Sequence, residues 1–135
     1  MGKIVGLDTN IFLFLLEENK HFIDQAEQIL SAVRDGKLRG IFSSIGLIEL
    51  LTGPKKRRRN DLAVRYREVI NNFPHLSVGG INENIVELAS NLRAHHSLRT
   101  PDAIHIATAI DFGAQSFITS DRRLKRVKEI NIVLI

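Results

Sequence analysis

The sequence predicts a single α/β domain of 135 residues, in which a parallel sheet of about five strands carries helices on both faces. Short apolar runs typical of buried strands alternate along the chain with longer segments whose apolar residues recur at helical spacing. This alternation favours right-handed crossovers between parallel strands. Hydrophobic residues make up 44% of the chain and charged residues 25%, which is ordinary for a globular domain. No linker or repeat divides the sequence, so we expect one domain over residues 1–135.

The first predicted strand ends on a carboxylate. Ile4, Val5 and Leu7 form an apolar run without alternation, as expected of a strand covered on both faces, and Asp8 follows at once. In an open parallel sheet, ligands bind just beyond the carboxyl ends of the strands, so Asp8 is a functional candidate. Residues 10–17 then predict a short helix with an apolar centre, which implies burial or contact with another chain.

The next segments predict a helix, a strand and a second helix. Residues 22–34 show helical spacing of apolar residues, and residues 40–43 form a short strand candidate. Ser44 is placed to cap a helix over residues 45–52, which the following Gly-Pro pair should end. Glu49 is the only charged side chain in that helix.

The middle of the chain continues the same pattern. A helix over residues 62–73 has one apolar face and stops at Pro74. Residues 76–78 predict a brief strand, and an amphipathic helix follows from Asn82 or Asn84.

The last part of the chain predicts two strands and two helices. Thr100 followed by proline is a strong helix start, and the small and apolar residues up to about residue 113 indicate close packing on the sheet. Residues 116–119 predict a strand, residues 122–128 a short basic helix, and residues 131–135 a final strand.

Four carboxylates lie near the predicted carboxyl ends of strands or on the helices that follow them: Asp8, Glu49, Asp102 and Asp121. Each alone has an ordinary explanation, such as capping a helix or pointing into solvent. Together on one sheet edge they would repel one another unless a cation neutralised them. The chain has no cysteine, and carboxylates without thiolates suit a hard cation, Mg²⁺ or Mn²⁺. Such a cation lowers the pKa of its bound water, which suits phosphodiester hydrolysis.

Polar residues near these acids have two interpretations. Asn10, Ser44 and Thr119 are close enough in sequence to orient the carboxylates by hydrogen bonds, or they serve as ordinary caps and turn residues. His105 lies one helical turn after Asp102 and shares its face. We expect it to be a packed, hydrogen-bonded residue rather than a general acid or base.

The charge balance favours a polyanionic partner. The net charge is +4, and two groups of cations stand out: Lys55, Lys56, Arg57, Arg58 and Arg59 in one run, and Arg122 and Arg123 after Asp121. Either group contacts RNA phosphates or is simply solvated surface. Aromatic residues make up only 6% of the chain, which gives little sign of a base-stacking platform.

Four segments together carry a resemblance to a known family: residues 7–10 (Leu-Asp-Thr-Asn), residues 44–51, residues 100–109 (beginning Thr-Pro-Asp-Ala) and residues 119–121 (Thr-Ser-Asp). Through them, nearly the whole chain resembles the PIN-domain ribonucleases, and most of all the VapC-type toxins of prokaryotic toxin–antitoxin pairs. The resemblance implies a metal-dependent endoribonuclease in which Asp8, Glu49, Asp102 and Asp121 surround Mg²⁺ or Mn²⁺. It further implies an RNA substrate, a homodimer and a cognate antitoxin that blocks the site.

Two other functions stay open at this point. A haloacid-dehalogenase-like phosphatase would use Asp8 as its nucleophile, but that family has a second aspartate where this chain has Asn10. A catalytically inert nucleic-acid-binding module on the same fold would not need the four acids. No apolar run approaches the ~18 residues of a membrane span, and the N-terminus lacks a signal-peptide pattern. We therefore expect a cytoplasmic protein without a membrane partner.

Overall fold

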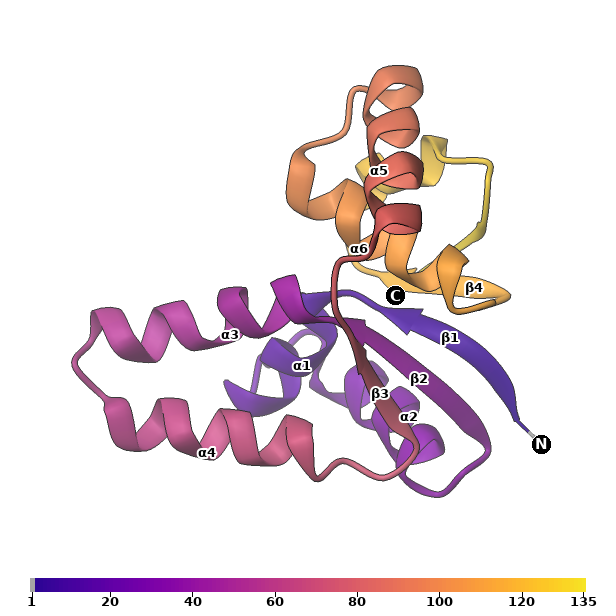
Figure 1. The fold of residues 1–135 in the computed structure, drawn as a ribbon. Coiled ribbons are helices and arrows are strands. Elements are labelled where there is room, and N and C mark those ends of the chain that lie inside the picture. Colours follow the sequence, from indigo (N-terminus) through magenta and orange to yellow (C-terminus); the bar gives the residue numbers. More distant parts are fainter. Residues whose placement is uncertain (1) are drawn as a thin grey trace.

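Five parallel strands form one central sheet in the computed structural model, which describes residues 2–135 (Figure 1). They are β1 (Lys3–Leu7), β2 (Leu38–Ser43), β3 (Leu76–Gly79), β4 (Ser116–Thr119) and β5 (Asn131–Leu134). Their order across the sheet is β3-β2-β1-β4-β5, and all neighbouring strands pair in parallel. The predicted α/β class and five-stranded parallel sheet are confirmed.

Helices cover both faces of this sheet. They are α1 (Thr9–Leu16), α2 (Ile23–Arg34), α3 (Ser44–Lys56), α4 (Asn60–Asn71), α5 (Glu83–His96), α6 (Thr100–Asp111) and the 3₁₀ helix η1 (Arg122–Arg126). In Figure 1, α1 to α4 gather on one side of the sheet, while α5 and α6 lie together on the other. No helix within residues 2–135 is long and apolar enough to cross a membrane.

Each face of the sheet has its own hydrophobic core, because neighbouring strand residues point to opposite sides. Ile41 and Phe117 pack into the core beneath α5 and α6. Phe42 and Ile118, the next residues along the same strands, pack into the core shared with α1 and α2. The apolar strands without alternation in the sequence therefore correspond to strands buried on both faces.

Helix α6 packs especially close to β1. A Cβ atom on Gly6 would come within 2.5 Å of the Ala109 Cβ and 2.9 Å of the Phe117 Cδ1. Only glycine on the strand and a small residue on the helix allow this approach. The small residues of the 100–113 segment predicted it, and the close approach brings the first turn of α6 toward the carboxyl end of β1.

The order of the strands creates a switch point beside β1. From β1 the chain builds β2 and then β3 on one side, and later returns to place β4 and β5 on the other. At such a point the connections leave two neighbouring parallel strands in opposite directions, and ligands bind outside their carboxyl ends. The carboxyl ends of β1 and β4, which we call the switch-point edge, are thus the place to look for function.

Several predicted helix ends differ from the structure. Helix α3 does not stop at residue 52 but continues through Gly53 and Pro54 to Lys56, because Gly53 keeps an ordinary helical φ and the buried Pro54 lies in the last turn. The cap of α3 is Ser43, whose Oγ accepts from the Ile45 N–H at 3.2 Å, since β2 leads straight into the helix.

Arg99, not Thr100, is the N-cap of α6, and its side chain makes no capping hydrogen bond, so the expected hydroxyl cap at Thr100 is wrong. The predicted basic helix after β4 is shorter than expected: it is a 3₁₀ helix of five residues, Arg122–Arg126.

Candidate active site

Asp8 lies at the switch-point edge, directly after β1. It is the N-cap of α1, so its Oδ1 accepts from the Thr9 N–H at 2.8 Å, while its Oδ2 accepts from the Thr119 hydroxyl at 2.7 Å. The capping explanation for Asp8 is thus correct, but it accounts for only one of the two carboxylate oxygens. The side chain is buried, with 8% of the residue exposed.

Burial raises the pKa of Asp8 above its ordinary value, because removal from water penalises the charged form. The nearby imidazole of His105 and the hydrogen bonds from Thr119 and Thr9 lower the pKa, and the charge of Asp102 raises it again. The balance is a pKa above 3.8. Asp8, which follows β1, and Asp102, in the first turn of α6, thus interact electrostatically although they are far apart in the sequence.

Thr119, the last residue of β4, links Asp8 to Asp121. Its fully buried hydroxyl donates to Asp8 and accepts from the Asp121 N–H at 3.0 Å. One hydroxyl therefore fixes both aspartates at the ends of two neighbouring strands. The prediction that Thr119 orients a carboxylate agrees with this geometry.

Asp121 is the N-cap of η1 and is held from two directions. Its Oδ1 accepts from the backbone N–H and the Nε of Arg123, each at 3.0 Å, and its Oδ2 pairs with the same guanidinium at 2.7 Å. Hydrogen bonding from Arg123 outweighs partial burial and lowers the pKa of Asp121, so this carboxylate is ionised at neutral pH.

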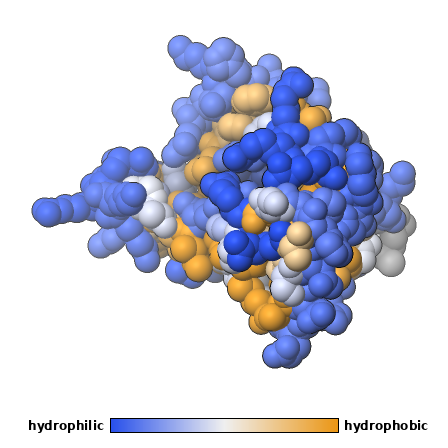
Figure 2. Space-filling model, turned by 90° about the horizontal axis from the view of Figure 1, so that it is seen from above, coloured by the Kyte–Doolittle hydropathy of each residue, from blue (hydrophilic) through white to orange (hydrophobic). Residues whose placement is uncertain are grey.

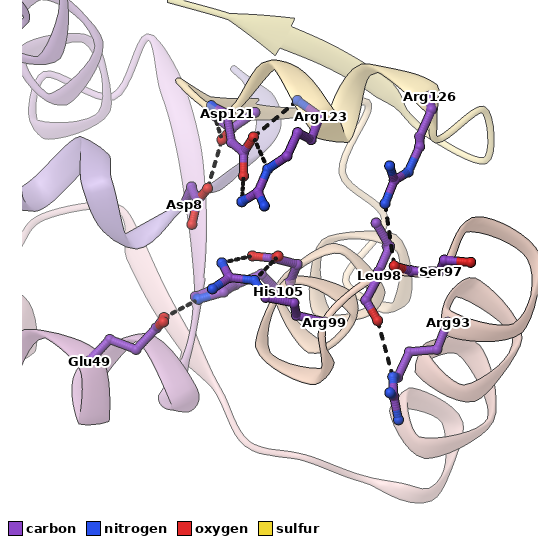
Figure 3. A network of polar contacts seen from close by, with 12 residues as sticks. Asp8, Glu49, Arg93, Ser97, Leu98, Arg99, His105, Asp121, Arg123 and Arg126 are labelled. Carbon is purple, nitrogen blue, oxygen red and sulfur yellow. Dashed lines mark hydrogen bonds and ion pairs between the residues drawn. The ribbon is translucent and has the colours of Figure 1, made fainter.

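Asp102 lies in the first turn of α6 and is largely buried, with 9% of the residue exposed. The guanidinium of Arg99, three residues earlier, pairs with both of its oxygens at 3.0 and 3.4 Å. Figure 3 shows the Arg99 and Arg123 side chains reaching toward the same region, with Asp8 beside it.

Glu49 projects from α3 into a separate hydrogen-bond cluster. Its Oε1 accepts from the His105 Nε2 at 2.7 Å (Figure 3). The same oxygen accepts from the Thr9 hydroxyl at 2.7 Å, and these two donors are 3.1 Å apart. Burial raises the pKa of Glu49, but the hydrogen bonds from His105 and Thr9 and the positive charge of Arg99 outweigh it, so its pKa lies below the usual range. His105 is buried and hydrogen-bonded, as expected, and its Nδ1 has no partner within residues 2–135.

The four acids thus lie in two connected groups. Asp8 and Asp121 share Thr119, Asp102 acts on Asp8 through its charge, and Thr9 joins Asp8 to Glu49. Across the described part of the chain, no three histidine or acidic side chains are grouped closely enough to form a ready-made metal site.

The other predicted residues lie around this centre or away from it. Neither Asn10 nor Ser44 hydrogen-bonds to any of the four carboxylates in the described residues. Lys55 and Lys56 end α3, and residues 57–59 form the turn to α4, which projects away from the sheet (Figure 1). The same projection is hydrophilic at the left of Figure 2.

Sequence reasoning missed Thr9 and Arg99. The signal for Thr9 was its place between Asp8 and Asn10, but its hydroxyl bonds to Glu49, which is far along the chain. The signal for Arg99 was its i,i+3 spacing to Asp102, which places an arginine and an aspartate on one side of a helix start.

Comparisons with known proteins agree with this fold. The sequence profile of the PIN domain matches residues 5–130. No curated protein matches the chain by sequence. A chain of the VapBC2 complex from Rickettsia felis, bound to a DNA fragment of its promoter, is similar with a TM-score of 0.78 and 20% identity, covering 97% of this chain and 98% of that one.

Two further solved structures are similar over almost their whole length. A chain of a toxin–antitoxin complex from Klebsiella pneumoniae has a TM-score of 0.73 and 24% identity, covering 98% of this chain and 96% of that one. VapC20 of Mycobacterium tuberculosis, described as a toxin that cleaves the sarcin–ricin loop, has a TM-score of 0.71 and 17% identity, covering 96% and 99%.

Proposed function

The chain belongs to the PIN domain family, and from this premise we propose that it is a divalent-metal-dependent endoribonuclease, the toxin of a toxin–antitoxin pair. The observation that carries the proposal is the pair of aspartates joined by Thr119 at the ends of β1 and β4, with the Asp102 carboxylate close enough to raise the pKa of Asp8. The similar structures of toxin–antitoxin complexes, and of a toxin that cleaves the sarcin–ricin loop, support it.

The donor chemistry of this site fits Mg²⁺ or Mn²⁺. Carboxylate oxygens are the ligands that hard cations prefer, and a positive charge would favour the ionised form of the buried Asp8 carboxylate, whose pKa burial and Asp102 raise. Asp8, Asp102 and Asp121 would hold the ion, with Glu49 at the margin of the site. A bound divalent ion supplies a water of lowered pKa and offsets negative charge on the phosphate.

The protein's own side chains position the reacting groups. Thr119 and the Thr9 N–H hold the Asp8 carboxylate in one orientation, so little reorganisation is needed when RNA binds. Glu49 is ionised at neutral pH, and its Oε2, free of the bonds made by Oε1, is an acceptor for a proton from an attacking water.

The basic groups would bind the RNA backbone. Arg122 and Arg123 follow Asp121 on η1, and residues 55–59 lie in the last turn of α3 and the turn to α4. Cations at these positions contact phosphates without reading sequence. The cations at residues 55–59 would contact phosphates of an RNA that extends beyond the cleaved bond.

We further propose a cognate antitoxin and a homodimer, in the cytoplasm. Several of the similar structures are toxin–antitoxin complexes, and apolar side chains such as Ile48 and Val64 are more than half exposed on α3 and α4. Sedimentation would give twice the chain mass of 15.2 kDa for the dimer, and a mass of one chain at all concentrations would contradict it.

The function is tested by cleavage of a mixed RNA pool with Mg²⁺, with Mn²⁺ and with EDTA. We expect metal-dependent cleavage that Asp8→Asn or Asp102→Asn lowers at least ~100-fold, the scale of losing a group that acts through the metal. The control is Asp24→Asn, an exposed aspartate of α2, which should cleave like the wild type.

The outcomes separate the proposal from its main rival. Cleavage within a few-fold of wild type in the Asp8 and Asp102 variants would overturn the assigned site. RNA binding without any metal-dependent cleavage would favour a catalytically inert binding module on the same fold.

A further inference from the structure

Arg99 occupies the centre of the site's charges, although it belongs to none of the cation groups seen in the sequence. Its guanidinium donates to both oxygens of the Asp102 carboxylate, at 3.0 and 3.4 Å. In Figure 3 it reaches toward the same region as the Arg123 side chain, which pairs with Asp121, and Asp8 lies beside that region. One guanidinium therefore lies among functional side chains from the end of β1, from α6 and from η1.

The backbone beneath Arg99 is held on both sides. The Arg93 Nε donates to the Leu98 carbonyl at 3.1 Å, and the Arg126 guanidinium donates to the Ser97 carbonyl at 3.3 Å (Figure 3). Leu98 itself is buried. The loop between α5 and α6 is thus anchored just before the residue that faces the acids.

The Arg99 side chain is oriented but still accessible. Asp102 accepts from the Nε and from one terminal nitrogen, while 64% of the side chain remains exposed to solvent. A guanidinium has five N–H donors, so donors remain for another partner. Because the Asp102 carboxylate already holds the guanidinium in one orientation, less side-chain entropy is lost when the remaining N–H donors bind a second anion.

We propose that Arg99 is a substrate-binding residue whose free N–H donors bind an RNA phosphate at the switch-point edge. The proposal rests on the proposed ribonuclease function and adds a residue outside its metal-binding and basic groups. Arg123 is held in the same way by Asp121, with 64% of its side chain exposed, and would bind an RNA phosphate on the other side of the site.

The test measures the affinity for a fluorescent random-sequence RNA of about 20 nucleotides, in EDTA, as NaCl is varied. Arg99→Gln should lower the slope of log K against log [NaCl] by about 0.7, the value for one lost phosphate contact on a single strand. The matched control is Arg34→Gln. Arg34 is also exposed and paired with a neighbouring aspartate, but it ends α2, away from the acids.

A double variant separates a phosphate contact from simple neutralisation of Asp102. Arg99→Gln with Asp102→Asn has the wild-type net charge and no uncompensated acid. We expect its salt slope to stay reduced. A wild-type slope in the double variant, or a slope for Arg99→Gln equal to that of Arg34→Gln, would overturn the inference.

Arg99→Lys covers the case in which Arg99→Gln does not fold. Lysine keeps the positive charge but lacks the paired N–H donors of a guanidinium. The slope of log K against log [NaCl] should therefore stay at the wild-type value. The RNA affinity should fall several-fold, about the effect of losing one bidentate contact. Unchanged affinity would contradict the inference. If the wild type binds RNA and these variants bind equally well, only the role of Arg99 fails. If the wild type does not bind RNA, the ribonuclease proposal fails and this inference falls with it.

Discussion

At the residue scale, Thr119 determines how two of the aspartates are held. Its hydroxyl is the only group that bonds to both Asp8 and Asp121 in the described residues, and it is fully buried. A buried hydroxyl with a donor and an acceptor role leaves two groups unpaired when it is removed. The residue is therefore part of the proposed active site even though it carries no charge.

Thr119→Val should lower RNA cleavage by about 10- to 100-fold, the usual effect of removing a group that orients a metal ligand. Thr119→Ser keeps the hydroxyl and should retain activity within a few-fold of wild type. The measurement is the single-turnover cleavage rate of both variants with Mn²⁺. Equal rates for valine and serine would show that the hydroxyl is not needed.

Asp8 also sets a cost in stability at neutral pH. Its pKa is raised from 3.8 on folding, so the folded state binds the proton more tightly than the unfolded chain does. The ionised form therefore destabilises the fold at neutral pH, and this cost disappears as the pH falls through the folded-state pKa toward 3.8.

Asp8→Asn should accordingly unfold at a higher urea concentration than wild type at about pH 7 in EDTA, while losing activity. The difference should shrink as the pH is lowered to about 4. Urea titrations at several pH values measure it. A variant that is less stable than wild type by the same amount at every pH would contradict the buried, ionised carboxylate.

Three of the acids could be singled out from the sequence because Asp8 and Asp121 stand just after strands and Asp102 stands in the first turn of a helix. Glu49, in the middle of α3, could be singled out as the one charged residue of an otherwise apolar stretch. The hydrogen-bond partners of these acids were harder to predict from the sequence. Glu49 pairs with Thr9 and His105, which come from two other helices, and no spacing rule connects residues so far apart. Arg99 was missed because an arginine before a helix has many ordinary explanations.

At the element scale, the contact between β1 and α6 sets the position of Asp102 relative to Asp8. Gly6→Ala would place a Cβ atom 2.5 Å from the Ala109 Cβ, so strand or helix must move, at a cost of about 1–3 kcal/mol. Gly80→Ala is the matched control, because nothing lies within 4 Å of a Cβ there. Urea unfolding measures both, and equal stability of the two variants would show that the packing is loose.

The sequence predicted the kind and order of the elements better than their ends. Alternating apolar strands and amphipathic helices were enough for the fold class. The end of α3 was predicted too early because Gly53 and Pro54 are typical helix stops, yet tertiary packing buries Pro54 and keeps the last turn helical. The caps of α3 and α6 were each displaced by one residue for the same reason: strand and loop geometry decide where a helix begins.

At the scale of the whole molecule, the topology collects residues that the sequence scatters. The strand order β3-β2-β1-β4-β5 puts the ends of β1 and β4 side by side, and α6 packs across them. Acids gather at that edge inside a chain of net charge +4. This arrangement suits a cation held by carboxylates and a polyanion held by the surrounding arginines.

The most direct test is to measure Mn²⁺ binding by electron paramagnetic resonance and RNA cleavage in the same samples of wild type, Asp8→Asn and Asp102→Asn. We predict that the Mn²⁺ concentration for half-maximal cleavage by the wild type matches its dissociation constant, and that both variants lose bound Mn²⁺ and cleavage together. Cleavage that persists in EDTA, or Mn²⁺ binding that is unchanged in both variants, would contradict a catalytic metal site at the ends of β1 and β4.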